Sequence, residues 1–113
     1  MLPTVNRLKK RVDFEKVKEV GRKFQSESFG LALVDRKDTK PTRFGFVVST
    51  KISKKAVARN KVKRNLKNAV QRLLSEVGGG YDVIFLAKRE ILAKDLLELE
   101  TEVKNIFKKI KLL

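Results

Sequence analysis

The chain of 113 residues contains no cysteine, no histidine and no tryptophan. The lack of cysteine excludes disulfide bonds and thiolate metal sites. The lack of histidine removes the most common general base, and with it a Ser–His–Asp triad and most zinc sites. Composition therefore argues against a catalytic centre or a metal site within the protein, and we assign no catalytic or metal-binding residue.

Acidic residues are also scarce, with 13 Asp and Glu against 28 Lys and Arg, so that the formal net charge is +15. Such an excess of one sign repels itself in a compact chain. A polyanion would neutralise it, because each Lys or Arg placed against a phosphate releases counterions. We therefore expect a nucleic acid as partner, with a merely soluble basic domain as the alternative.

Long apolar runs are missing as well. No segment approaches the roughly 20 apolar residues of a membrane span, and the first ten residues have no apolar core of a signal peptide. We expect a cytoplasmic protein with neither a membrane nor an obligate protein partner. The length and the 42% hydrophobic content fit a single domain over residues 1–113, and the charge makes it a candidate RNA-binding domain. The basic residues 1–10 are expected to be loosely ordered.

Apolar spacing predicts the elements that are present. Helical periodicity predicts helices at 13–20, 56–77 and 95–113, and alternation predicts strands at 28–34, 43–50 and 81–88. The strand–helix–strand unit over 44–88 implies a parallel pair within a mixed sheet. The fold class is therefore α+β, an α/β sandwich in the order helix, strands, helix, strand, helix.

The first two strands have unequal faces. Phe29, Leu31 and Leu33 share one face of the first, as do Phe44, Phe46 and Val48 on the second, whereas the opposite faces carry small residues such as Gly30, Ala32, Gly45 and Ser49. We expect the bulky face to meet the main helices. The small face should hold the helix at 13–20 or leave a shallow cleft.

The segment from Lys51 to Ser75 holds nine basic residues and no acidic one. Helical geometry places Asn60, Arg64, Lys67 and Gln71 on one exposed line opposite the apolar stripe. An ordinary surface helix mixes signs, because opposite charges four residues apart stabilise it. This segment forgoes such pairs, which predicts a phosphate-binding face, with an idle basic surface as the alternative.

The run KAVARNKVKR at residues 55–64 resembles the arginine-rich signature of the bacterial ribonuclease P protein family. RFGFVVS at 43–49 is similar to the strand before that signature, and Arg7 to Lys10 with Phe14 is similar to the N-terminal pattern of the family. Tyr81 to Lys88 resembles its last strand. The resemblance covers roughly residues 6 to 110.

This resemblance implies a mixed four-stranded sheet packed with three helices and a left-handed strand–helix–strand crossover, although general rules favour the right-handed form. It implies the protein subunit of ribonuclease P, which removes the 5′ leader of precursor tRNA. In the family the signature helix binds the catalytic RNA, the cleft between the first helix and the sheet binds the single-stranded leader, and RNA-bound Mg²⁺ performs hydrolysis. The protein alone is then expected to bind no cofactor and to cleave nothing.

The candidate site residues fall into two groups. Those expected to bind the RNA subunit are Lys51, Lys54, Lys55, Arg59, Asn60, Lys61, Lys63, Arg64 and Lys67. Those expected to bind the leader are Phe14, Lys18, Ser49 and Lys88, although Phe14 could equally belong to the core. Lys61 stands where the signature has Arg, and Lys18 and Ala32 stand where relatives carry aromatic residues. Leader binding should therefore depend more on charge than on stacking.

Two other functions stay open at this stage. A ribosomal-type protein that binds structured RNA would share this composition and have no enzymatic role. A stand-alone metal-dependent nuclease needs clustered carboxylates, whereas the acidic residues here are scattered. Glu98 and Glu102 could share a cation, or they could form an ordinary solvent face that pairs with Lys94 and nearby lysines.

Overall fold

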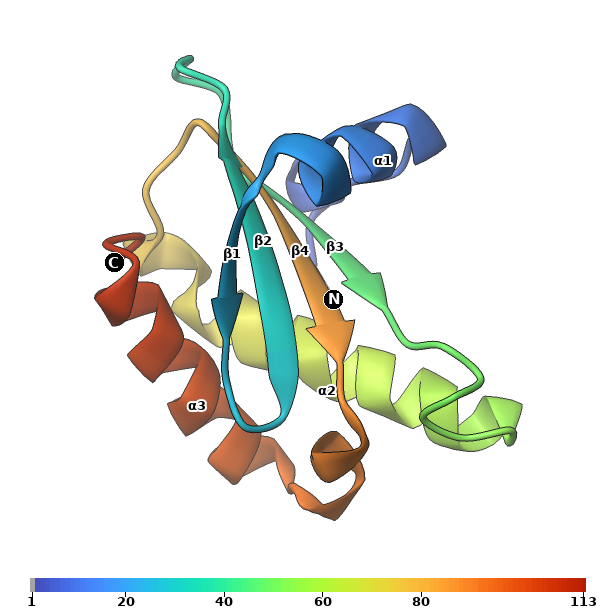
Figure 1. Cartoon of the computed structure of the whole chain (residues 1–113). Helices are drawn as coiled ribbons and strands as arrows, with labels where there is room; N and C mark the ends of the chain where they lie inside the picture. The colour runs from blue at the N-terminus through green and yellow to red at the C-terminus, as the bar shows by residue number, and fades with distance from the viewer. Residues whose placement is uncertain (1) are drawn as a thin grey trace.

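The computed structural model describes residues 2–113 as a sheet with α1 on one face and α2 and α3 on the other (Figure 1). The elements in chain order are η1 (Thr4–Asn6), α1 (Arg11–Val20), β1 (Arg22–Gln25), β2 (Phe29–Asp35), β3 (Arg43–Val47), α2 (Ala56–Leu73), η2 (Leu74–Glu76), β4 (Tyr81–Ala87), η3 (Arg89–Ala93) and α3 (Leu96–Lys109).

The four strands lie in the order β1-β2-β4-β3. β4 is antiparallel to β2 and parallel to β3, with Ile84 opposite Ala32 on one side and Gly45 on the other. In Figure 1, β3 and β4 both run downward with β4 to the left of β3, while α2 lies behind the sheet. The path from β3 through α2 to β4 is therefore left-handed, as the resemblance implies and against the general preference.

Several boundaries differ from the expected ones. β1 was not predicted from the pattern, because its four residues are mostly exposed and polar. The strand expected over 43–50 ends at Val47, and the helix expected over 56–77 ends at Leu73 and tightens into the 3₁₀ turn η2. The last helix begins after Asp95, which forms a capping box with Glu98.

The bulky face of the sheet meets α2 and α3, as predicted. Phe29, Phe44 and Phe85 from three strands, together with Phe107 from α3, are each at most 1% exposed. The ring of Phe85 lies 5.1 Å from that of Phe29 and 6.0 Å from that of Phe107. Leu66, Ala69 and Val70 of α2 belong to the same core. This face supplies most of the buried apolar surface and hence the main stabilisation.

The small face holds α1 over only part of its area. Val17 packs with Ala32 and Ile84 in a second, smaller cluster, and Leu8 joins it from the N-terminal segment. A Cβ at Gly21 would lie within 3.3 Å of the backbone of Leu33, so that the end of α1 sits directly on β2. α1 therefore crosses the half of the sheet where β4 begins and leaves the half where β4 ends uncovered.

The N-terminal segment is packed rather than loose, contrary to the expectation for residues 1–10. Leu2 is 1% exposed in the main core and Leu8 is 5% exposed in the smaller cluster. The side-chain amide of Asn6 donates to the carbonyl of Thr42 at 2.9 Å, and Arg7 pairs with Phe44 as a parallel bridge. Met1, the first residue of that segment, lies outside the described residues.

Candidate nucleic-acid interface

α2 separates its apolar and cationic residues as expected. Val62, Leu66 and Leu73 are buried, whereas Asn60, Lys61, Arg64, Lys67 and Gln71 are exposed. The first turn contains no acidic residue, so that the positive end of the helix dipole is not compensated from within the helix. The exposed face of α2 is therefore favourable for anions, most of all at its N-terminal end.

Two of the expected cations on α2 are partly used by the fold. Nη1 of Arg59 donates to the carbonyl of Ser53 at 2.9 Å and closes the turn before the helix. Lys63 is half-buried beside the N-terminal segment. Both remain near the face, but Arg59 is held by the loop and is a weaker candidate for a forked phosphate contact than Arg64.

The loop between β3 and α2 adds three exposed lysines to this end of the molecule, Lys51, Lys54 and Lys55. Lys51, Ile52, Ser53 and Lys54 line a depression of about 540 Å³ together with Arg89. Nε of Arg89 donates to the carbonyl of Lys51 at 3.1 Å, which ties the loop to η3. The cationic surface thus continues beyond the helix onto η3, where the sequence had not indicated it.

A first groove runs between α2 and the N-terminal segment, with a volume of about 520 Å³. Its lining consists of Leu2, Arg7, Asn60, Lys63, Arg64, Lys67 and Asn68. Every charged group in it is cationic, and the two amides can bond to 2′-hydroxyls or base edges. Arg7 and Asn68 also line this groove, although the sequence did not single them out. No periodicity in the sequence brings residue 7 beside α2.

A second groove, of about 270 Å³, lies on the other side of the same segment and reaches Phe14 on α1. The ring of Phe14 rests on Gly45, where an added Cβ would lie 2.5 Å from its Cε1 and Cζ atoms. Phe14 is half-buried and packs against the small cluster. Phe14 is therefore partly a core residue and partly the wall of a groove.

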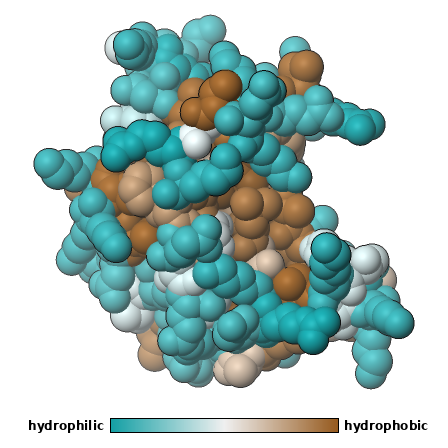
Figure 2. Space-filling view, viewed as in Figure 1, coloured by the Kyte–Doolittle hydropathy of each residue, from teal (hydrophilic) through white to brown (hydrophobic). Residues whose placement is uncertain are grey.

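The uncovered part of the small face is shallow and apolar. Val47 and Leu86 are half-buried there, and the side chain of Gln25 lies over Gly30, within 3.3 Å of the position of a Cβ. Figure 2 shows hydrophobic side chains gathered in the middle of this face and hydrophilic ones around them. The surface can accept flat apolar groups such as bases, with polar groups at its margin.

The remaining leader candidates do not converge on one point. Ser49 is exposed just beyond β3, and Lys88 follows β4, so that both lie at the same end of the parallel pair. Nζ of Lys88 donates to the carbonyl of Ser26 at 2.7 Å, which holds the β1–β2 hairpin. Lys18 is exposed on α1, one turn after Phe14. Ser49 and Lys88 therefore lie at one end of the open face, whereas Lys18 lies on the helix that covers the other half of the sheet.

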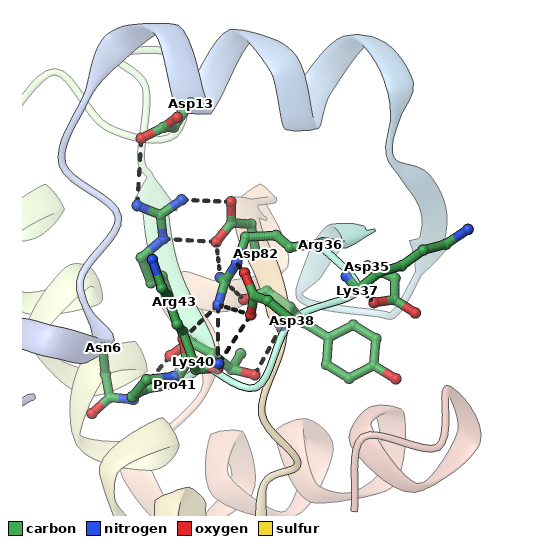
Figure 3. A network of polar contacts seen from close by, with 12 residues as sticks. Asn6, Asp13, Asp35, Arg36, Lys37, Asp38, Lys40, Pro41, Arg43 and Asp82 are labelled. Atoms are coloured by element: carbon green, nitrogen blue, oxygen red, sulfur yellow. Dashed lines mark hydrogen bonds and ion pairs between the residues drawn. The ribbon is translucent and has the colours of Figure 1, made fainter.

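A buried ionic cluster fixes the other end of this face (Figure 3). Asp82 is 6% exposed and accepts from Nε and Nη2 of Arg43, both at 2.8 Å, and also from Arg36. Arg43 continues to Asp13 on α1 at 3.5 Å. Arg36 donates to the carbonyls of Tyr81 and Pro41 and thereby closes the β2–β3 loop. The cluster links α1, β3, β4 and this loop.

These contacts also stabilise the charged form of both arginines. The hydrogen bond to Asp38 raises the pKa of Arg36, and the hydrogen bond to Asp82 raises the pKa of Arg43. The same contact with Arg36 lowers the pKa of the exposed Asp38 carboxyl. Because both guanidinium groups are held by carboxylates, this cluster is a structural element rather than a site for phosphate.

The acidic residues of α3 have partners within the protein, which favours the alternative to a cation shared by Glu98 and Glu102. Glu98 completes the capping box with Asp95, and Glu102 accepts from the backbone of Ser28 at 2.8 Å. Lys94 pairs instead with Glu27 at 2.6 Å. Across residues 2–113, no group of three or more metal-binding side chains comes together. Nor, within that range, is any helix long and apolar enough to cross a membrane.

Fold and surface together define a small, strongly cationic α+β protein with one acid-free helix face. The Ribonuclease P family model matches residues 2–111. The ribonuclease P protein component of Pseudanabaena sp. is 37% identical over 113 residues, which is all of this chain and 97% of the relative. That of Symbiobacterium thermophilum is 34% identical over 95% of this chain and 92% of its own length.

Solved structures agree with these sequence relatives. A Staphylococcus aureus RNase P protein mutant with defective mRNA degradation activity superimposes with a TM-score of 0.86 at 25% identity, covering 96% of this chain and 90% of its own. The RNase P protein from Thermotoga maritima gives 0.81 at 25% identity, covering 91% and 96%. The chain belongs to the ribonuclease P protein family. The prediction of a protein subunit of this endoribonuclease is confirmed.

Proposed function

We propose that this protein binds the catalytic RNA of ribonuclease P through α2 and the single-stranded 5′ leader of precursor tRNA through the open part of the small sheet face. The observation that carries the first half is the acid-free exposed face of α2 with its adjoining groove. Four cations and two amides line that groove, a donor set suited to phosphates and 2′-hydroxyls.

The second half is supported by the shape of the small face. Gly30 and Gly45 have no side chains that would project from the sheet, and Phe14 provides an aromatic ring at the edge of this surface. Base–aromatic stacking contributes about 1–3 kcal/mol per base. Among residues 2–113, Phe14 is the one ring that we place at this face, so Lys18 on α1 and Lys88 after β4 should supply a larger share of the leader affinity.

Hydrolysis is assigned to Mg²⁺ held by the RNA subunit. The carboxylates of this chain are scattered or engaged in ion pairs and helix capping, as described for Asp82, Glu98 and Glu102. The protein's own contribution is then to bind and position RNA. A ribosomal-type RNA-binding role is less well supported, because the family match extends over nearly the whole chain.

Reconstitution with a bacterial ribonuclease P RNA tests the function as a whole. We expect the protein to stimulate cleavage of precursor tRNA at the mature 5′ end, and to show no cleavage with magnesium alone. Cleavage by the nuclease-treated protein without the RNA subunit would contradict the proposed division of labour.

The face assignment is tested by Arg64→Ala. The variant should fold normally by circular dichroism and bind the RNA subunit about 1–3 kcal/mol more weakly, the range for hydrogen bonds to charged groups. Lys104→Ala removes one cation from the exposed surface of α3 and serves as the control. Equal affinities for the two variants would mean that the cationic face of α2 is idle.

A further inference from the structure

The two grooves described above are not separate. The groove beside α2 and the groove that reaches Phe14 share four lining residues, Leu2, Arg7, Lys63 and Lys67. The N-terminal segment lies between them, because Leu2 belongs to the core on the α2 side of the sheet and Leu8 to the cluster on the α1 side. The segment thus crosses the edge of β3 and forms a wall common to both grooves.

Hydrogen bonds to backbone carbonyls, as well as packing, hold this wall in place. The amide of Leu8 donates to the carbonyl of Phe44 at 2.9 Å, and Asn6 donates to Thr42 at 2.9 Å. Nε of Arg7 donates to the carbonyl of Leu2 at 2.7 Å, which aligns the guanidinium along the segment. A half-buried arginine held in this way presents its remaining donors at low entropic cost.

The charges at this wall are of one sign. Arg7, Lys63 and Lys67 line both grooves, Lys9 adds a cation to the second, and no acidic residue lines either groove. Outside the shared part, the first groove leads to Arg64 and Asn60, and the second leads to Phe14 and Gly45. The chemistry that fits the shared part is the phosphate backbone of RNA, approached from two sides.

We propose that Arg7, Lys63 and Lys67 form a shared phosphate-binding wall, which contacts the RNA subunit on the α2 side and the leader on the α1 side. The proposal rests on the proposed function, since it takes from it that α2 binds the RNA subunit and that Phe14, which lines the second groove, borders the leader site. Two RNA backbones that meet across the edge of β3 repel each other. Cations placed between them reduce that repulsion for both strands, so these residues serve both binding events.

The test measures two quantities in each variant. One is the affinity of the protein for the RNA subunit. The other is the preference of the saturated holoenzyme for precursor tRNA with a long over a short leader. Arg7→Ala and Lys67→Ala should each lower both quantities about five-fold, which corresponds to ~1 kcal/mol at 1.4 kcal/mol per factor of ten.

Lys67→Ala guards against a merely structural effect. Arg7 donates a hydrogen bond to the carbonyl of Leu2, whereas the side chain of Lys67 forms no hydrogen bond or ion pair within residues 2–113. Removing the Lys67 side chain therefore changes the charge without loosening the N-terminal segment. Arg11→Ala is the matched control, because Arg11 is 92% exposed at the start of α1 and lines neither groove. It should change neither quantity.

The outcomes separate this proposal from the proposed function. If Arg7→Ala and Lys67→Ala lower only one of the two quantities, or neither, the shared wall is overturned. The proposed function would still stand if Arg64→Ala weakened binding of the RNA subunit and Lys18→Ala reduced the leader preference. If those two variants also had no effect, the proposed function itself would fail.

Discussion

The two faces of the sheet are built from the same strands but differ in how they pack. On one face, Phe29, Phe44 and Phe85 interdigitate with two helices and are almost completely buried. On the other, Gly30, Ala32 and Gly45 alternate with those residues, and α1 covers only part of the surface. Alternation along each strand therefore lets one sequence segment encode a tightly packed core and a low, partly open surface.

The largest effect should come from the packed face. Phe85 is fully buried, and its ring contacts those of Phe29 at 5.1 Å and Phe46 at 5.4 Å. Phe85→Ala should lower the free energy of unfolding by ~3–5 kcal/mol, measured by urea denaturation. Leu86→Ala, its neighbour on the open face, should cost less than ~2 kcal/mol, the lower end for a fully buried leucine. Equal losses would contradict the difference between the faces.

Gly45 tests the open face next. A methyl group at this position collides with the ring of Phe14 at 2.5 Å, so Gly45→Ala should displace the ring and destabilise the protein by ~1–3 kcal/mol, as overpacking does. The holoenzyme should also lose part of its preference for long leaders. In Gly30→Ala the new methyl meets only the end of the Gln25 side chain at 3.3 Å. Gly30→Ala should therefore retain stability, and it serves as the control for overpacking.

A smaller effect is expected where α1 is tied to the sheet. Asp13→Asn weakens the 3.5 Å contact with Arg43, and Glu15→Gln removes an exposed pair with Arg11 on the same helix. Both substitutions remove one negative charge, so a general electrostatic effect on RNA binding would be equal. Asp13→Asn should reduce the leader preference, with a stability loss below ~1 kcal/mol. A matching reduction in Glu15→Gln would show that the position of α1 is not the cause.

The smallest effect is a change in salt dependence. Each phosphate neutralised by the protein contributes a slope of about −0.7 for single-stranded nucleic acid. Lys18→Ala should therefore make the dependence of the long-leader preference on log salt shallower by about 0.7. Lys16 is exposed on the same helix two residues earlier, and Lys16→Ala should leave the slope unchanged. An unchanged slope in Lys18→Ala would remove Lys18 from the leader site.

The sequence predicted the elements that have a strong pattern. Strands β2 and β4 and the buried stripe of α2 follow from alternation and helical spacing, and the bulky face was assigned correctly from Phe29 and Phe44. The apolar pattern did not predict β1, because its four residues are mainly exposed and the strand is held by pairing with β2. The left-handed crossover came from family resemblance alone, since physical rules favour the other hand.

The candidate site was less predictable than the fold. The exposed line on α2 depends on helix geometry and was therefore visible in the sequence. Arg7 was not, because its place beside α2 depends on a backbone bridge to Phe44, 37 residues further along the chain. The engagement of Lys88 with Ser26 likewise depends on a contact across 62 residues. Tertiary pairing of this kind leaves no local signal.

The position of β4 has a consequence for how the molecule is made. β4 is the last strand in the chain, yet it lies between β2 and β3. During synthesis β3 and the N-terminal segment that pairs with it have no neighbour in the rest of the sheet until residue 87 has been added. Folding through such distant pairings is slow. The cationic segment Lys51–Ser75 is thus exposed on the nascent chain before a sheet exists to support it, and a chain that stops before β4 should remain unfolded.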